Sequence, residues 1–155
     1  MVHSKTVIFQ HPEDTDKFSS RFAENLRSGD VILLNGDVGA GKSFFCRALI
    51  RSVLLFDEDI PSPTFTLVQQ YETAIGELWH ADLYRLCTSD EVVELGLFDA
   101  FEYAVVLIEW PNQIDGLSPN SALNVQISVT GETSRRFEFS WSDSKWAEKL
   151  ACYEY

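Results

Sequence analysis

The clearest chemical signal in the sequence is a glycine-rich stretch, Gly36-Asp37-Val38-Gly39-Ala40-Gly41-Lys42-Ser43. It fits the pattern Gly-x-x-x-x-Gly-Lys-Ser/Thr, and a loop with so few Cβ atoms can turn its backbone N–H groups toward phosphate oxygens as it enters a helix. We predict that Lys42 neutralises the β and γ oxygens of a nucleotide and that the Ser43 hydroxyl is a Mg²⁺ ligand. The predicted nucleotide-binding residues here are Gly36, Val38, Gly39, Ala40, Gly41, Lys42 and Ser43. The alternative, a glycine-rich turn with an exposed lysine, is disfavoured by the strand-like run before the loop and the helical spacing after it.

Glu109 and Trp110, which follow a predicted buried strand, are further candidate site residues. Glu109 directly follows the wholly apolar run Ala104–Ile108, which is typical of a strand covered on both faces. Proteins with a phosphate-binding loop place a carboxylate there to hold Mg²⁺ or to orient the attacking water, and we predict this role for Glu109 rather than that of a solvated residue at a strand end. Trp110 either stacks on a base or a partner or simply packs.

A threonine after the loop's helix is a candidate switch residue. Thr64 lies in Ser-Pro-Thr-Phe at positions 62–65. A threonine at this place can bind Mg²⁺ and sense the γ-phosphate. The alternative is a proline turn before a strand.

The segment His-Ala-Asp-Leu-Tyr-Arg at 80–85 concentrates polar side chains. Strand alternation would place His80, Asp82 and Tyr84 on one face. Asp82 would then complete the Mg²⁺ site or position water, and Arg85 would reach a phosphate oxygen. An edge strand with solvated polar residues is the equally weighted alternative.

Other kinds of site are disfavoured. Asn112-Gln113-Ile114-Asp115 resembles the guanine reader Asn-Lys-x-Asp, but the lysine is replaced and the segment begins three residues after Glu109, so ATP is the expected nucleotide. The three histidines lack zinc-ligand spacing. The cysteines, Cys46, Cys87 and Cys152, are widely spaced and form no Cys-x-x-Cys, so we expect them to be reduced and mostly to pack.

The elements that position these residues alternate between strand and helix patterns. We predict strands at 6–9, 31–34, 65–71, 77–84, 104–108, 123–129 and 136–141, and helices over about 18–26, 42–55 and 89–95 and from 142 onward. The strands at 65–71 and 77–84 are predicted to form one hairpin. Those at 123–129 and 136–141 are predicted to form a second, peripheral hairpin. The predicted fold class is α/β: a single-domain P-loop NTPase-like fold over residues 1–155, with a mixed β-sheet, flanking helices and peripheral hairpins.

Composition limits the partners. The 155 residues carry a formal net charge of −12, with 45% apolar residues, so the chain can bury a core but is poorly suited to grip nucleic acid alone. The longest apolar runs are too short to cross a membrane and no signal-peptide pattern is present, so a cytoplasmic protein is expected.

Five segments together resemble the TsaE (YjeE) family of small bacterial P-loop ATPases. They are Gly-Asp-Val-Gly-Ala-Gly-Lys-Ser at 36–43, Ser-Pro-Thr-Phe-Thr-Leu-Val at 62–68, His-Ala-Asp-Leu-Tyr-Arg-Leu at 80–86, Glu-Leu-Gly-Leu at 94–97 and Ile-Glu-Trp-Pro at 108–111. Their order and spacing also fit. The chain after about Pro119 carries no strong family signature.

The resemblance implies an ATP-binding, slowly hydrolysing protein that uses ATP and Mg²⁺. It would work with the TsaD and TsaB proteins when threonylcarbamoyl is placed on adenosine beside the anticodon of tRNA, without transferring that group itself and meeting tRNA only through the complex. Carried over by position, Glu109, Asp82 and Thr64 become the candidate catalytic residues. Ser43, Glu109 and Thr64 become the Mg²⁺ ligands, and Trp110 lies close to the nucleotide.

Two other functions are weighed against this one. A small-molecule kinase needs an acceptor pocket and usually an arginine-bearing lid, yet only Arg85 lies between the loop's helix and Glu109. A non-catalytic nucleotide sensor would let ATP occupancy change partner affinity, with hydrolysis incidental. The sequence does not separate the sensor from the ATPase.

Overall fold

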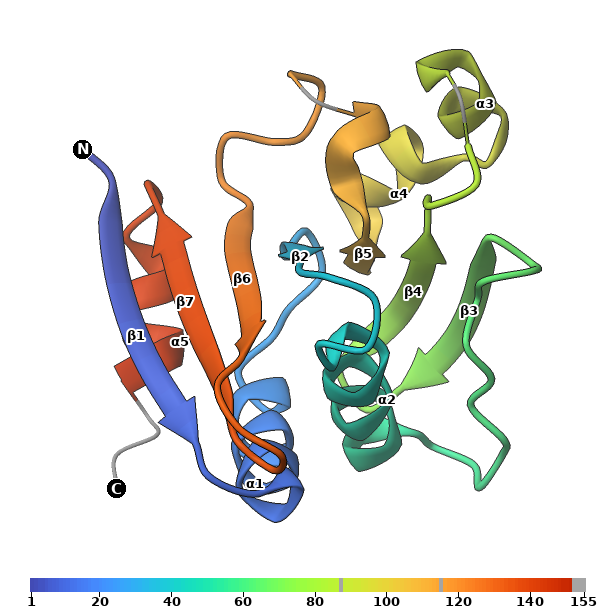
Figure 1. The fold of residues 1–155 in the computed structure, drawn as a ribbon. Coiled ribbons are helices and arrows are strands. Elements are labelled where there is room, and N and C mark those ends of the chain that lie inside the picture. Colours follow the sequence, from blue (N-terminus) through green and yellow to red (C-terminus); the bar gives the residue numbers. More distant parts are fainter. Residues whose placement is uncertain (87, 115, 152–155) are drawn as a thin grey trace.

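The apolar runs and the alternating segments form the strands of a single sheet (Figure 1). The computed structural model describes residues 1–86, 88–114 and 116–151. The strand order is β1-β7-β6-β2-β5-β4-β3. The strands are β1 (His3–Phe9), β2 (Val31–Asn35), β3 (Val68–Thr73), β4 (Gly76–Asp82), β5 (Val105–Glu109), β6 (Leu123–Val129) and β7 (Arg135–Trp141). The helices are α1 (Pro12–Ala23), α2 (Lys42–Val53), α3 (Ser89–Glu94), α4 (Leu97–Tyr103) and α5 (Lys145–Ala151), with a short 3₁₀ helix η1 (Pro111–Ile114).

The centre of the sheet is parallel and its flanks are antiparallel. Strand β2 pairs in parallel with β5 and β6, and β5 pairs in parallel with β4. The pairs β3–β4, β6–β7 and β1–β7 are antiparallel. The carboxyl ends of β2, β4 and β5 therefore meet at one edge of the sheet, where ligands bind in open α/β folds. This mixed sheet with flanking helices confirms the predicted fold class.

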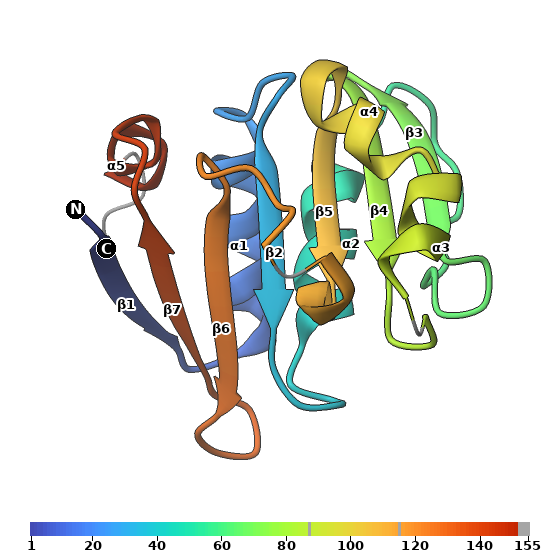
Figure 2. The same cartoon turned by 90° about the horizontal axis from the view of Figure 1, so that it is seen from above.

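Two apolar layers cover the two faces of the sheet. Figure 2 shows α1 and α2 behind it and α3 and α4 in front of β4 and β5. On the α1 and α2 face, Phe18, Phe22 and Phe45 stack on one another and meet Phe137 and Phe139 of β7. On the other face, Trp79 packs edge-on against Tyr103, with ring centroids 6.3 Å apart. These buried rings anchor the strands whose ends carry the polar residues.

The last hairpin is not peripheral as predicted, because β6 lies inside the sheet. Its residues Leu123, Val125 and Ile127 are buried in the α1 and α2 layer, and the strand pairs with β2. Alternating hydrophobicity identifies a strand with one buried face, but it does not say which strand becomes its neighbour. The first hairpin, β3 and β4, does lie at the edge of the sheet, with β3 as the outermost strand.

Among the other differences from prediction, such as the start of α1 at Pro12 rather than near residue 18, three lie on the side of the sheet that carries β3, β4 and β5. Helix α4 was not predicted, because it is only seven residues long and leads directly into β5. Strand β3 begins at Val68 rather than residue 65, since Leu67 adopts a left-handed backbone with φ 71°. Strand β4 ends at Asp82, so Tyr84 lies beyond it.

The remaining sequence predictions divide between described and undescribed residues. Cys46 is a free, buried cysteine, whereas Cys87, Cys152 and Asp115 lie outside the described residues. Among the helices that are described, none combines the length and apolar character needed to cross a bilayer.

Candidate nucleotide-binding site

The glycine-rich loop joins the end of β2 to the start of α2, as predicted. Gly36 has φ 152°, and a Cβ atom there would lie only 2.6 Å from the backbone oxygen of Ile127 on β6. Gly41 precedes the helix with φ 113°. Both conformations favour glycine, and the close approach at Gly36 brings the start of the loop directly against β6.

An arginine that the sequence reasoning missed braces the loop from behind. Arg135, at the start of β7, donates from Nε to the Ala40 carbonyl oxygen at 3.0 Å. It also donates to the carbonyl oxygens of Gly131 and Ser134 at 3.2 and 2.9 Å. No sequence signal predicted this contact, because it joins residues far apart in the chain through the position of β7.

Lys42 lies at the mouth of the loop among acceptors. Its ammonium group donates to the carbonyl oxygens of Gly36 and, at 3.1 Å, Asp37. It also lies 3.9 Å from the centroid of the Trp110 ring, close enough for a cation–π contact. Burial lowers the pKa of Lys42, against the opposing attraction of the Glu109, Asp82 and Asp37 carboxylates. The lysine is therefore partly desolvated and lies close to three carboxylates.

Ser43 and Glu109 meet directly. The Ser43 hydroxyl donates to both carboxylate oxygens of Glu109, at 2.9 and 3.0 Å. Glu109 also contacts His80, whose Nε2 lies 2.7 Å from Oε2. The pairing of β4 with β5 sets Asp82 opposite Glu109, so both carboxylates stand side by side where the parallel strands end. This register brings together residues from three separate sequence motifs.

Thr64, in the segment before β3, lies beside these carboxylates. Its hydroxyl donates to Asp82 Oδ2 at 3.2 Å and shares a hydrogen bond of 2.8 Å with Ser62. Arg85 donates to the carbonyl oxygens of Thr64 and Phe65, at 2.9 and 2.7 Å. Arg85 thus holds this segment, whereas the sequence had suggested a phosphate contact for it.

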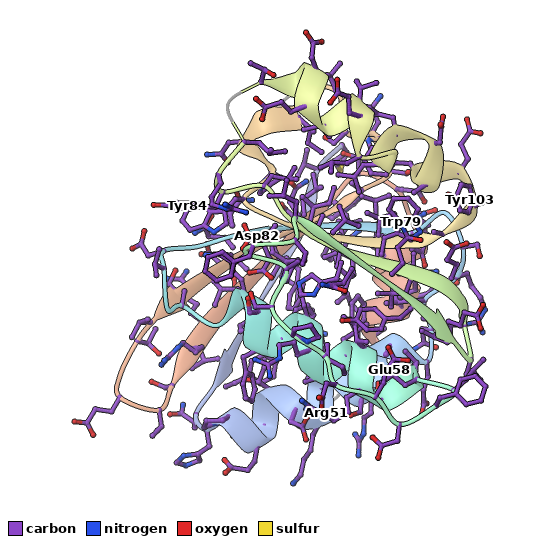
Figure 3. The ribbon with its side chains drawn as sticks, turned by 90° about the vertical axis from the view of Figure 1, so that its right-hand side faces the viewer. Arg51, Glu58, Trp79, Asp82, Tyr84 and Tyr103 are labelled. Carbon is purple, nitrogen blue, oxygen red and sulfur yellow. The ribbon has the colours of Figure 1, made fainter. Side chains whose placement is uncertain are left out.

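A cleft of about 400 Å³ lies between the glycine-rich loop and the ends of β4 and β5. Figure 3 shows Asp82, at the end of β4, near Tyr84, whereas Trp79 lies farther back along β4. The cleft brings together most of the predicted residues, namely Val38, Gly39, Gly41, Lys42, Ser43, Thr64, Asp82, Glu109 and Trp110. Gly36 and Ala40 do not line it. Phe44 and Tyr84, which were not predicted to bind, also line it, and Tyr84 packs on Trp110 with ring centroids 4.8 Å apart.

A second cavity of about 230 Å³ lies on the other side of the loop. It shares Gly39, Gly41 and Phe44 with the cleft. Pro12, Thr15, Glu132, Thr133, Arg135 and Phe137 line the rest, together with Ala40. The turn between β6 and β7 is tied to the start of α1, because Thr133 donates to the Gln10 carbonyl oxygen at 2.9 Å.

The donor set of the cleft fits a divalent cation beside a phosphate chain. Ser43, Thr64, Asp82 and Glu109 offer hydroxyl and carboxylate oxygens, the hard ligands that Mg²⁺ takes. Lys42 and the loop that leads into α2 offer positive charge and N–H donors for phosphate. Both requirements of a Mg²⁺–nucleotide site are therefore met by neighbouring residues.

Comparison with known proteins gives the same family as the sequence motifs. The family model of the threonylcarbamoyl adenosine biosynthesis protein TsaE matches residues 9–137. The tRNA threonylcarbamoyladenosine biosynthesis protein TsaE of Rickettsia bellii is 38% identical over 135 residues, covering 87% of this chain and 93% of that protein. The protein of the same name from Bacillus subtilis is 34% identical over 131 residues, covering 84% and 81%.

A solved structure agrees over nearly the whole chain. The crystal structure of Bacillus subtilis YdiB superposes with a TM-score of 0.80 at 26% sequence identity, covering 97% of this chain and 94% of that one. The family match spans the loop, the Thr64 segment, the end of β4 and Glu109. The chain belongs to the TsaE family of threonylcarbamoyl adenosine biosynthesis proteins.

Proposed function

We propose that this chain is a Mg²⁺-dependent, ATP-binding ATPase that acts in the cytoplasm with TsaD and TsaB in threonylcarbamoyladenosine modification of tRNA. The observation that carries the proposal is the cluster at the end of the phosphate loop. There the Ser43 hydroxyl, the Glu109 carboxylate and the Thr64–Asp82 pair surround one cleft beside Lys42. This arrangement supports phosphoryl chemistry better than any other.

The nucleotide occupies both the cleft and the second cavity. The phosphates occupy the cleft in front of the loop. The base enters the second cavity, where Pro12, Phe44 and Phe137 offer apolar walls for a flat ring. Because Phe44 and the loop line both hollows, one ligand can fill both.

The residues of the cleft change partners when the nucleotide binds. Ser43 and the carboxylates beside it would hold Mg²⁺, which would supply positive charge to neutralise the phosphates. Lys42 exchanges the carbonyl oxygens of Gly36 and Asp37 for phosphate oxygens. The Ser43 hydroxyl, which donates to the Glu109 carboxylate here, would offer its oxygen to the ion. Glu109 then orients the attacking water, and Asp82 holds the Thr64 hydroxyl in place.

The partner surface adjoins the Thr64 segment. Phe65 is 83% exposed and lies directly after the threonine that faces the cleft, so a change at Thr64 reaches the surface through one peptide bond. Contact with TsaD and TsaB through this segment makes their binding depend on the nucleotide. The net charge of −12 disfavours a direct grip on tRNA, which would be met through those proteins.

The test is ATP turnover with Mg²⁺ by the wild-type chain and by Lys42→Ala and Glu109→Gln, each alone and with TsaD and TsaB. Glu102→Gln, an exposed residue of α4 outside the cleft, is the matched control. We expect the partners to change the wild-type rate, both cleft variants to lose turnover and the control to keep it. Equal turnover in wild type and Glu109→Gln would contradict the site assignment.

The sensor function is distinguished by partner binding rather than turnover. If turnover is absent and ATP still changes the affinity for TsaD and TsaB, the chain is a nucleotide sensor. Equal affinity with ATP, with ADP and without nucleotide would refute a switch at Thr64. Product analysis that shows phosphoryl transfer to a metabolite would instead identify a kinase.

A further inference from the structure

A buried histidine stands behind the cleft and is not among the residues assigned above. His80 lies on β4 two residues before Asp82, and it is 0% exposed. Its Nε2 atom lies 2.7 Å from Oε2 of Glu109, and both side chains are almost fully excluded from solvent. The histidine therefore touches the cleft's carboxylate from the protein interior rather than from the cleft.

The direction of this hydrogen bond follows from the other contacts of Glu109. Both carboxylate oxygens accept from the Ser43 hydroxyl, so Glu109 acts as an acceptor and the proton shared with His80 belongs to Nε2. The carboxylate is thus held from two sides. Ser43 holds it from the loop, and His80 holds it from the sheet.

The other ring nitrogen shows that His80 is not explained by packing. Within the described part of the chain, Nδ1 of His80 is buried without a hydrogen-bond partner. Burying a polar atom in this way destabilises the fold, and an apolar side chain of similar size would avoid the cost. A gain at Nε2, the contact with Glu109, accounts for the histidine.

The neighbouring thiol does not compete for this role. The Sγ atom of Cys46 and ligand atoms of His80 and Glu109 lie within 4.8 Å of one another. Burial raises the pKa of Cys46 well above its usual value of 9.0, which disfavours the thiolate form that metals bind. Cys46 therefore forms part of the apolar wall around the pair.

We propose that His80 is a positioning residue, whose Nε2–H fixes the Glu109 carboxylate in the orientation needed for ATP hydrolysis. The proposal rests on the proposed ATPase function. If the Ser43 hydroxyl served a bound ion instead of Glu109, the hydrogen bond from His80 would still orient the carboxylate. Removing a histidine-to-carboxylate contact of this kind behind a metal or water site typically lowers activity by about 10- to 100-fold.

Two amide substitutions separate orientation from packing. The amide nitrogen of glutamine reaches about as far as Nε2 of histidine, whereas that of asparagine reaches only about as far as Nδ1. We therefore compare ATP turnover of the wild type, His80→Gln and His80→Asn, with TsaD and TsaB present. We expect His80→Asn to lower kcat about 10- to 100-fold with KM for ATP unchanged, and His80→Gln to restore most of the rate.

Cys46→Ala is the matched control, because it alters the same buried wall without touching the hydrogen bond. It should keep the wild-type kcat, and thermal unfolding of every variant shows whether the fold is retained. Equal loss in His80→Gln and His80→Asn would overturn the proposal in favour of packing. Wild-type turnover in His80→Asn would overturn it as well.

A second measurement does not depend on turnover. Nitrogen-15 NMR of the labelled rings reports which nitrogen of His80 carries the proton, and loss of the signal in His80→Gln assigns it. We expect the proton on Nε2. A proton on Nδ1 alone overturns the proposal whatever the kinetics show. If the wild type does not hydrolyse ATP, the proposed function fails, and this spectrum alone then decides whether His80 donates to Glu109.

Discussion

Replacing Gly36 with alanine tests the contact between the glycine-rich loop and β6. The added Cβ would meet the backbone oxygen of Ile127 at 2.6 Å, several tenths of an ångström closer than real Cβ atoms come, and φ at this position is 152°. Ile127 is buried and is paired with Phe137 on β7. The strand therefore cannot retreat without disturbing its ladder and the core beneath it.

The expected cost has two parts. The backbone conformation costs an L-residue about 1–3 kcal/mol. Forcing a methyl group against a packed backbone adds about 1–3 kcal/mol. We therefore expect the free energy of unfolding to fall by about 3 kcal/mol, which for a chain of this size lowers Tm by roughly 6–12 °C.

Gly39→Ala is the matched control, because Gly39 also has a positive φ, 82°, yet a Cβ there meets nothing within 4 Å. Its loss should be the conformational part alone, about 1–2 kcal/mol. Urea unfolding followed by circular dichroism measures both variants against the wild type. If Gly36→Ala and Gly39→Ala lose the same stability, the argument from the β6 contact is wrong.

Three further predictions concern the attachment of α5, the Thr64 segment and the buried thiol. Asp30 is buried and accepts from two lysines of α5. Asp30→Ala should therefore lower the free energy of unfolding, measured in urea, by about 2 kcal/mol, a figure that allows for the lysines turning to solvent. An unchanged urea midpoint would contradict this. Arg85→Ala removes the hydrogen bonds to the Thr64 and Phe65 carbonyl oxygens, so limited chymotrypsin should cut after Phe65 faster, with global stability unchanged; cleavage at the wild-type rate would show that Arg85 does not hold the segment. The pKa of Cys46 is raised by burial, so at pH 8, below that pKa, iodoacetamide should label Cys46 only after denaturant is added, as mapped by mass spectrometry. Labelling at Cys46 itself in the folded chain would refute its burial.

The order of the elements around the loop was predictable from sequence because each has a local cause. The glycine loop requires a strand before it and a helix after it, and β2 and α2 are found there. The strict alternation from Leu123 to Val129 predicted β6 to the residue. The position of β6 beside β2 was not predictable, because a strand's hydrogen-bonding partners leave no trace in its own alternation.

The candidate site was predictable residue by residue but not as a geometry. Lys42, Ser43 and Glu109 each sit at the end of a recognisable element, so their meeting was expected. The contact of Asp82 with Thr64 depends on strand register and on the turn before β3. The contact of Arg135 with the loop joins residues far apart in the sequence, and only the assembled sheet brings them together.

The bracing of the loop by β6 and β7 has a consequence for how the protein is made. During synthesis the loop leaves the ribosome long before the residues that support it, Ile127 behind Gly36 and Arg135 behind Ala40. Contacts between such distant segments form late in folding, because closing long loops costs entropy first. A nascent chain therefore carries the complete glycine motif before its supporting contacts exist. On the proposed function, nucleotide capture would then report that the final hairpin has docked.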